Sequence, residues 1–163
     1  MSGEAKASRE TSLLPVALAR RLGFTLVRAS AGMTRLGAET LEPLGIDGRH
    51  YGVLAALSEL GPVSQQTLAD IFAVDRSTMV GFVDELERKG HVRRGKNPSD
   101  RRAYALELTP SGVKVEREAA ELLAGCERHY LEPLSAAERR LLLELLRRLV
   151  ARDVARTGRE ERR

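Results

Sequence analysis

The segment Asp75-Arg-Ser-Thr-Met-Val-Gly-Phe-Val-Asp-Glu-Leu-Glu-Arg-Lys-Gly90 decides the fold, because its apolar residues recur at the spacing of a helix with one buried side. Those apolar residues are Met79, Phe82, Val83 and Leu86, and the residues opposite them are Ser77, Gly81, Asp84 and Arg88. Asp75 can cap the first turn and Gly90 can end the last one. We therefore predict a helix that begins after Asp75 and reaches Lys89.

A shorter helix precedes this segment. Ser64 can act as its N-cap, and its apolar residues are Leu68 and Ile71. The connector Phe72-Ala73-Val74 then leads into the longer helix. Two helices joined by a turn of about three or four residues form a helix-turn-helix.

The pattern changes after Gly90 from helical to alternating. Residues 91–95 can form a strand, residues 96–100 are rich in turn formers, and residues 104–108 alternate as in a half-buried strand. The larger side chains of this second strand are Tyr104, Leu106 and Leu108. A helix-turn-helix followed by a hairpin is a winged helix, so we predict a mostly helical α+β fold with one small β-hairpin.

The N-terminal part of the chain precedes this lobe. Residues 1–10 are small and polar, and we expect them to form a disordered arm. Thr11 or Ser12 can then cap a long first helix that runs to the region of Gly45, with a break near Gly32.

Capping residues predict three further helices. The caps are Asp47 for a second helix that ends at Gly61, Thr109 with Pro110 for a fifth helix to about Tyr130, and Ser135 with Glu138 for a sixth helix. The apolar side of the second helix holds Tyr51, Leu54, Leu57 and Leu60.

Length and composition limit the classes of protein. The chain has 163 residues with 42% hydrophobic and 31% charged residues and no Trp, which is typical of one aliphatic, charge-rich domain with appended helices. Its formal net charge is only +4, but residues 88–102 hold seven basic side chains and one acid. A local basic segment on a nearly neutral chain indicates nucleic-acid binding, with a solvated charged loop as the alternative.

Several other classes are disfavoured. The single Cys126 cannot form an intrachain disulfide, and we expect no metal site and no cofactor, because no cluster of Cys or His has ligand spacing. The histidines lie far apart and near no catalytic motif, so we do not expect an enzyme. The N-terminus lacks an apolar signal segment and no apolar run could cross a bilayer, so we expect a cytoplasmic, nucleoid-associated protein with no membrane partner.

The ordered set of motifs resembles the MarR family of transcription regulators. The matching stretches are Leu68-Ala-Asp-Ile, the segment Asp75 to Gly90, Asn97-Pro-Ser-Asp-Arg-Arg-Ala103 and Leu108-Thr-Pro-Ser-Gly112, with Leu44-Gly-Ile and Tyr51-Gly-Val-Leu further out. The resemblance covers nearly the whole chain. It implies a winged helix-turn-helix flanked by N- and C-terminal dimerisation helices.

The start of the longer helix has side chains suited to DNA. A helix fits the major groove, and Arg76, Ser77 and Thr78 supply a guanidinium and two small hydroxyls that can reach base edges or phosphates. Capping beside Asp75 is the alternative role for the two hydroxyls.

The next turns of this helix are less polar than the family pattern. Val80 can meet a thymine methyl group, and Gly81 can let the helix backbone approach DNA closely. Phosphate would repel Asp84, Glu85 and Glu87, so we expect the first two turns to enter the groove while these acids tilt away or pair with nearby bases.

The tip of the hairpin carries the most diagnostic charges. The resemblance implies that Asp100 and Arg102 are the wing pair of the family, with Arg102 inserted into the minor groove and oriented by the carboxylate. Arg94 and Lys96 would neutralise phosphates. The other expected DNA contacts are Ser64, Gln65, Arg88 and Arg101.

A two-fold dimer on a pseudo-palindromic operator in double-stranded DNA is the economical way to gain specificity. The sixth helix carries an apolar stripe that suits an interface with the first helix, as in the family. The expected interface residues are Leu18, Leu22, Leu142, Leu145, Leu146 and Leu149.

Family members commonly respond to a small aromatic or lipophilic acid. Such an effector would lie near Phe24, Arg28, His50 and Tyr51, although a histidine at a helix start is more often a capping or surface residue. We therefore expect a ligand-released repressor.

Two alternative functions remain at this point. One is a winged-helix protein without ligand sensing that binds a protein or RNA, and the other is a thiol-redox sensor that acts through Cys126. Relatives that sense thiols usually carry the reactive cysteine in the first helix, which has none here, so an inert thiol is the better interpretation. The predicted organisation is an arm at 1–10, an N-terminal dimerisation helix at 11–46, a DNA-binding lobe at 47–109, C-terminal dimerisation helices at 110–157 and a frayed tail at 158–163.

Overall fold

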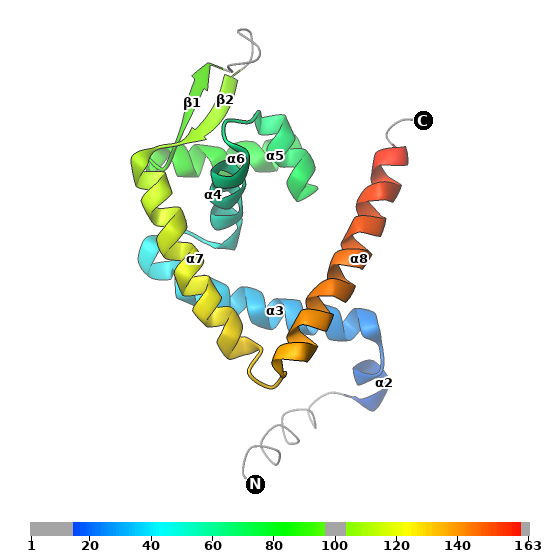
Figure 1. The fold of residues 1–163 in the computed structure, drawn as a ribbon. Coiled ribbons are helices and arrows are strands. Elements are labelled where there is room, and N and C mark those ends of the chain that lie inside the picture. The colour runs from blue at the N-terminus through cyan, green and yellow to red at the C-terminus, as the bar shows by residue number, and fades with distance from the viewer. Residues whose placement is uncertain (1–14, 97–103, 161–163) are drawn as a thin grey trace. The chain divides into compact units, whose positions relative to one another are not determined.

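The computed structural model describes residues 15–96 and 104–160. It is mostly helical with one antiparallel hairpin, as predicted (Figure 1). The chain divides into two compact units, Met1–Cys126 and Glu127–Arg163. The elements are α2 (Val16–Ala19), α3 (Leu22–Leu41), η1 (Glu42–Leu44), α4 (Gly48–Leu60), α5 (Gln65–Phe72), α6 (Arg76–Arg88), β1 (Val92–Lys96), β2 (Tyr104–Leu108), α7 (Pro110–Tyr130) and α8 (Ala136–Glu160).

The core of the first unit lies between α4, α5, α6 and the hairpin. Contacts join α5 to α6, α4 to α6, α4 to β2 and α6 to β1 (Figure 1). Leu54, Leu68, Met79 and Leu106 are fully buried and belong to one apolar cluster. The helix-turn-helix and the hairpin therefore share a single core, which fixes the hairpin beside the helix before it.

The predicted caps of helices α4 to α8 are confirmed. The Asp47 carboxylate accepts hydrogen bonds from the amides of Arg49 and His50 at 2.9 and 3.0 Å, and the Ser64 hydroxyl accepts one from the Thr67 amide at 3.0 Å. Each of these bonds satisfies an amide that a helix leaves unpaired in its first turn. The other confirmed caps are Asp75 for α6, Thr109 for α7 and Ser135 with Glu138 for α8.

The first helix differs from the prediction. The helix is interrupted at Arg20 and Arg21, between α2 and α3, and α3 is continuous through Gly32. A glycine is tolerated inside a long helix at a cost of about 1 kcal/mol relative to alanine, so it need not break one. The predicted caps Thr11 and Ser12 lie outside the described residues.

Two expectations drawn from the spacing of apolar residues differ from the structure: that Leu60 lies on the buried side of its helix, and that residues 104–108 alternate. Leu60 and Ile71 are each 52% exposed, because they lie in the last turns of α4 and α5, away from the core. Ala105 is as buried as Leu106, so simple alternation along β2 is wrong here. The isolated bridge between Val63 and Leu106 brings another segment against this strand.

A tight backbone junction connects the hairpin to α7. The Thr109 amide donates to the His91 carbonyl at 3.0 Å, and its hydroxyl donates to the Gly90 carbonyl at 2.6 Å. Gly112, in the first turn of α7, lies so close that a Cβ built on it would be 2.0 Å from the His91 oxygen. Only glycine at this position permits α7 to approach the His91 carbonyl so closely.

The second unit consists of the end of α7 and all of α8. The Ser135 amide and hydroxyl donate to Glu138 at 2.8 and 2.6 Å, which completes the predicted capping box. Helix α8 continues through Glu160, so it includes the first three residues of the segment expected to fray.

We predict opposite stability effects for the same substitution at two helical glycines. Gly112→Ala should lower the free energy of unfolding by about 1–3 kcal/mol, because its Cβ would overlap a backbone oxygen. Gly81→Ala is the matched control: it has open space around it and should raise that free energy by about 0.5–1 kcal/mol. Urea unfolding of both variants measures the difference. If the two substitutions change the unfolding free energy equally, the close contact of Gly112 with His91 does not constrain that position.

Candidate nucleic-acid interface

Helix α6 has one buried and one exposed side, as its sequence predicts. Met79, Val83 and Leu86 are fully buried, and Phe82 packs against the same cluster. The exposed residues opposite them are Ser77, Gly81, Asp84 and Arg88. Packing therefore turns this second set of residues outward, as a recognition helix requires.

Asp75 organises the first turn of α6. Its carboxylate accepts hydrogen bonds from the Thr78 amide at 2.9 Å, from the Thr78 hydroxyl at 2.5 Å and from the Ser77 hydroxyl. The Ser77 and Thr78 hydroxyl bonds, followed by that of the Thr78 amide, hold the pKa of Asp75 well below its usual range. The capping role considered for both hydroxyls is thus present, and each oxygen keeps lone pairs that can accept a further hydrogen bond.

The next turn presents little side chain. A Cβ at Gly81 would meet no atom within 4 Å, and Val80 beside it is half-buried. Between Ser77 and Asp84 the outward side of the helix consequently has few projecting side-chain atoms, so a partner can approach the helix backbone closely.

The acids of α6 pair with bases, as the sequence suggested they could. Asp84 Oδ1 lies 2.6 Å from Arg94 Nη2, and Glu87 pairs with the other terminal nitrogen of Arg94. Glu85 Oε2 lies 3.1 Å from His50 Nε2. The hydrogen bond with Asp84 is the main reason that the pKa of Arg94 is raised.

The other predicted DNA contacts lie around α6 or beyond the described residues. Ser64 and Gln65 begin α5, Arg76 and Arg88 are exposed at the two ends of α6, and Lys96 ends β1 opposite Tyr104. The predicted wing residues Asp100, Arg101 and Arg102 lie outside the described residues.

The residues predicted around an effector have separate environments. His50 is 6% exposed and completes the capping box of α4, where its Nδ1 accepts from the Asp47 amide at 3.3 Å. Tyr51 is half-buried, and burial together with the charge of Glu116 raises its pKa. In the part of the chain that the structure describes, Phe24 is half-buried and Arg28 is exposed, and no hydrogen bond or ion pair joins either of them to His50.

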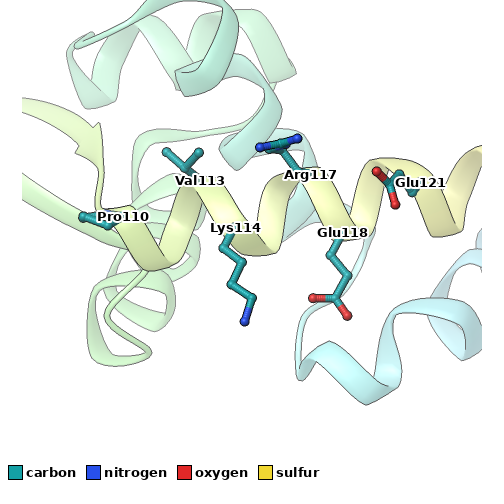
Figure 2. Close-up of a pocket in the computed structure, with 6 residues that line it drawn as sticks. All are labelled: Pro110, Val113, Lys114, Arg117, Glu118 and Glu121. Carbon is teal, nitrogen blue, oxygen red and sulfur yellow. The ribbon is translucent and has the colours of Figure 1, made fainter.

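The α7 surface contains an open hollow of about 340 Å³ that the sequence did not predict. Figure 2 shows Val113, Arg117 and Glu121 along one side of this helix, and Lys114 and Glu118 along another. None of the predicted effector residues lines it. Cys126, further along α7, is half-buried, and its role as a thiol sensor stays a prediction.

Two contacts between elements were not predicted from the sequence. The His50 to Glu85 contact joins α4 to α6 across residues 35 positions apart, and the approach of Gly112 to His91 depends on how α7 docks. The Leu108-Thr-Pro-Ser-Gly112 motif was the only signal for the latter. Within residues 15–96 and 104–160, no three potential ligands form a metal cluster, and no helix is both long and apolar enough to span a bilayer.

A helix-turn-helix whose second helix faces outward beside a basic hairpin defines a winged-helix, DNA-binding class of protein. The sequence model of the MarR family matches residues 49–104. A relative from Thauera aromatica is named as a transcriptional regulatory protein for the hcr operon. It is 36% identical over 137 residues, which cover 83% of this chain and 82% of that protein. The chain therefore belongs to the MarR family, so it is a transcription regulator and not an enzyme.

Two solved structures of similar chains support the same fold. CouR from Rhodococcus jostii RHA1, bound to p-coumaroyl-CoA, is 29% identical with a TM-score of 0.75, over 83% of this chain and 95% of that one. A mutant MarR from E. coli complexed with operator DNA is 26% identical with a TM-score of 0.72, over 78% of this chain and 92% of that one. The winged-helix fold is thus confirmed.

We predict that Asp75 makes stability depend on pH in acid. Its pKa is lower in the folded protein, so its contribution is complete above its unfolded pKa of about 4 and is lost as pH falls through the folded pKa. Asp75→Asn keeps a capping residue but removes this titration. The gap in unfolding free energy between wild type and variant should be constant above about pH 5 and narrow below pH 4.

Urea unfolding from pH 2 to pH 7 measures this gap. Asp70→Asn, which removes an exposed charge on α5 whose carboxylate accepts from Gln66 at 2.8 Å, controls for general charge effects. If the unfolding free energies of wild type and Asp75→Asn differ by the same amount at every pH, the Asp75 carboxylate does not titrate as described.

Proposed function

We propose that the protein is a dimeric repressor that binds a pseudo-palindromic operator with α6 in the major groove and the hairpin in the adjacent minor groove. The observation that carries this proposal is the outward side of α6, where the short residues Ser77 and Gly81 allow close approach to base edges. Arg76 and Arg88 at the ends of the helix would contact phosphates. The similar MarR chain complexed with operator DNA supports this use of the fold.

The dimer would use the apolar residues of α2, α3 and α8. Leu22 is 70% exposed, and Leu145 and Leu149 are 45% and 52% exposed in the single chain. Large exposed apolar side chains along helices indicate an interface. The proposed interface also includes Leu18, Leu142 and Leu146.

The effector would be an aromatic acid or one of its thioesters, bound near Phe24, Arg28, His50 and Tyr51. CouR, which is similar over most of this chain, has p-coumaroyl-CoA bound, and this supports the chemical class. The ligand would act by binding better to a lobe spacing that does not fit the operator, which needs about 1–3 kcal/mol of coupling. Binding to a promoter in the cytoplasm would then exclude polymerase until the effector is present.

The first test is DNA binding. Selection of bound sequences from chromosomal fragments should return a pseudo-palindrome with half-sites about 34 Å apart. If about six phosphates are neutralised per dimer, log affinity should fall with log salt with a slope of roughly −5. Arg102→Ala should weaken operator binding by more than about 1 kcal/mol. A slope near zero would exclude the proposal.

The dimer is tested separately by size-exclusion chromatography with light scattering. Wild type should have twice the 17.9 kDa mass of one chain at micromolar concentration, and Leu145→Glu should shift toward the monomer because a charge would be buried in the interface. Leu60→Glu, at a site of similar exposure on α4, is the matched control and should remain dimeric. A monomeric wild type would refute the proposed assembly.

A further inference from the structure

We propose that Arg94 is a positioning residue for DNA recognition: it bridges the hairpin to Asp84 and Glu87 of α6 and does not serve as a phosphate ligand. The proposal rests on the DNA-binding function above. It differs from the sequence-based expectation, in which Arg94 neutralises the DNA backbone directly.

The geometry places Arg94 between two functional elements. It lies in β1 opposite Leu106, two residues after the buried Val92, so both side chains lie on the same face of the hairpin. Its two terminal nitrogens pair with different carboxylates of α6, one of them at 2.6 Å. A planar guanidinium can hold two carboxylates at once, whereas a lysine ammonium is a single point charge.

The bridge removes a local electrostatic conflict. Asp84 lies on the outward side of α6 with its side chain 53% exposed, and Glu87 is 39% exposed. Both carboxylates would face phosphates across the groove once α6 enters it, and like charges there lower affinity. Arg94 is the base on the described hairpin whose contacts cover both of them.

The bridge also limits how the hairpin can rotate relative to α6. Beyond Val92 the strand leaves the core, and Arg94 is the next side chain on that face to contact α6. The neighbouring Arg93 lies on the other face and pairs with Glu107 of β2 at 2.8 Å, within the hairpin. Arg93 therefore has the same charge and strand but no link to α6, which makes it a matched control.

The test is a cycle of variants measured against the operator that wild type selects. Arg94→Gln should weaken operator binding about fivefold or more, and Arg93→Gln should change it less than about threefold. In an Asp84→Asn, Glu87→Gln background the further change Arg94→Gln should cost less than about twofold, because the acids that it covers are gone. Arg94→Lys should resemble Arg94→Gln, since it keeps the charge but cannot bridge both acids.

A role in folding alone is distinguished by thermal unfolding. An ion pair that is partly exposed contributes little to stability, so the unfolding midpoint of Arg94→Gln should differ little from that of Arg93→Gln, although their operator affinities differ. If Arg94→Gln costs as much without the two acids as with them, or if Arg94→Lys binds like wild type, Arg94 is a phosphate ligand and the proposal is wrong. If wild type selects no sequence, the proposed function itself fails.

Discussion

The packing of the inner side of α6 against α4 and the hairpin supports every other feature of the DNA-binding lobe. Met79, Val83 and Leu86 are fully buried in the same cluster as Leu54 and Leu106. Burial of such side chains contributes about 1.5–3 kcal/mol each. Because these residues define the inner side of α6, the residues on its opposite side face outward as a consequence.

A second constraint is the close junction at the end of α6. The hydrogen bonds of Thr109 to Gly90 and His91 tie the end of the hairpin back to its start, and Gly112 lets α7 approach the same carbonyl. Within the first unit, the hairpin is thus held at its base by backbone contacts and further out by Arg94. Rigid placement of the hairpin matters because two grooves must be contacted together.

The charges of the lobe show why a count of basic residues is a poor guide to DNA contacts. The segment 88–102 is strongly basic, yet Arg93 and Arg94 pair with acids of the same lobe. The hydroxyls of Ser77 and Thr78 likewise donate to Asp75. Several groups that suit DNA by residue type therefore also have structural roles, and their contributions to recognition pass through these partners.

The sequence by itself determined the helices, the caps at Asp47, Ser64 and Asp75, the outward side of α6, the hairpin and the family, because these depend on local spacing and on motif order. It misplaced the break near Gly32, and it predicted that Leu60 would lie on a buried side, since periodicity cannot tell where a helix end leaves the core. Only the tertiary structure decided the partners of Arg94, the contact of His50 with Glu85 and the need for glycine at 112. These depend on distances between elements, which packing sets and local spacing does not.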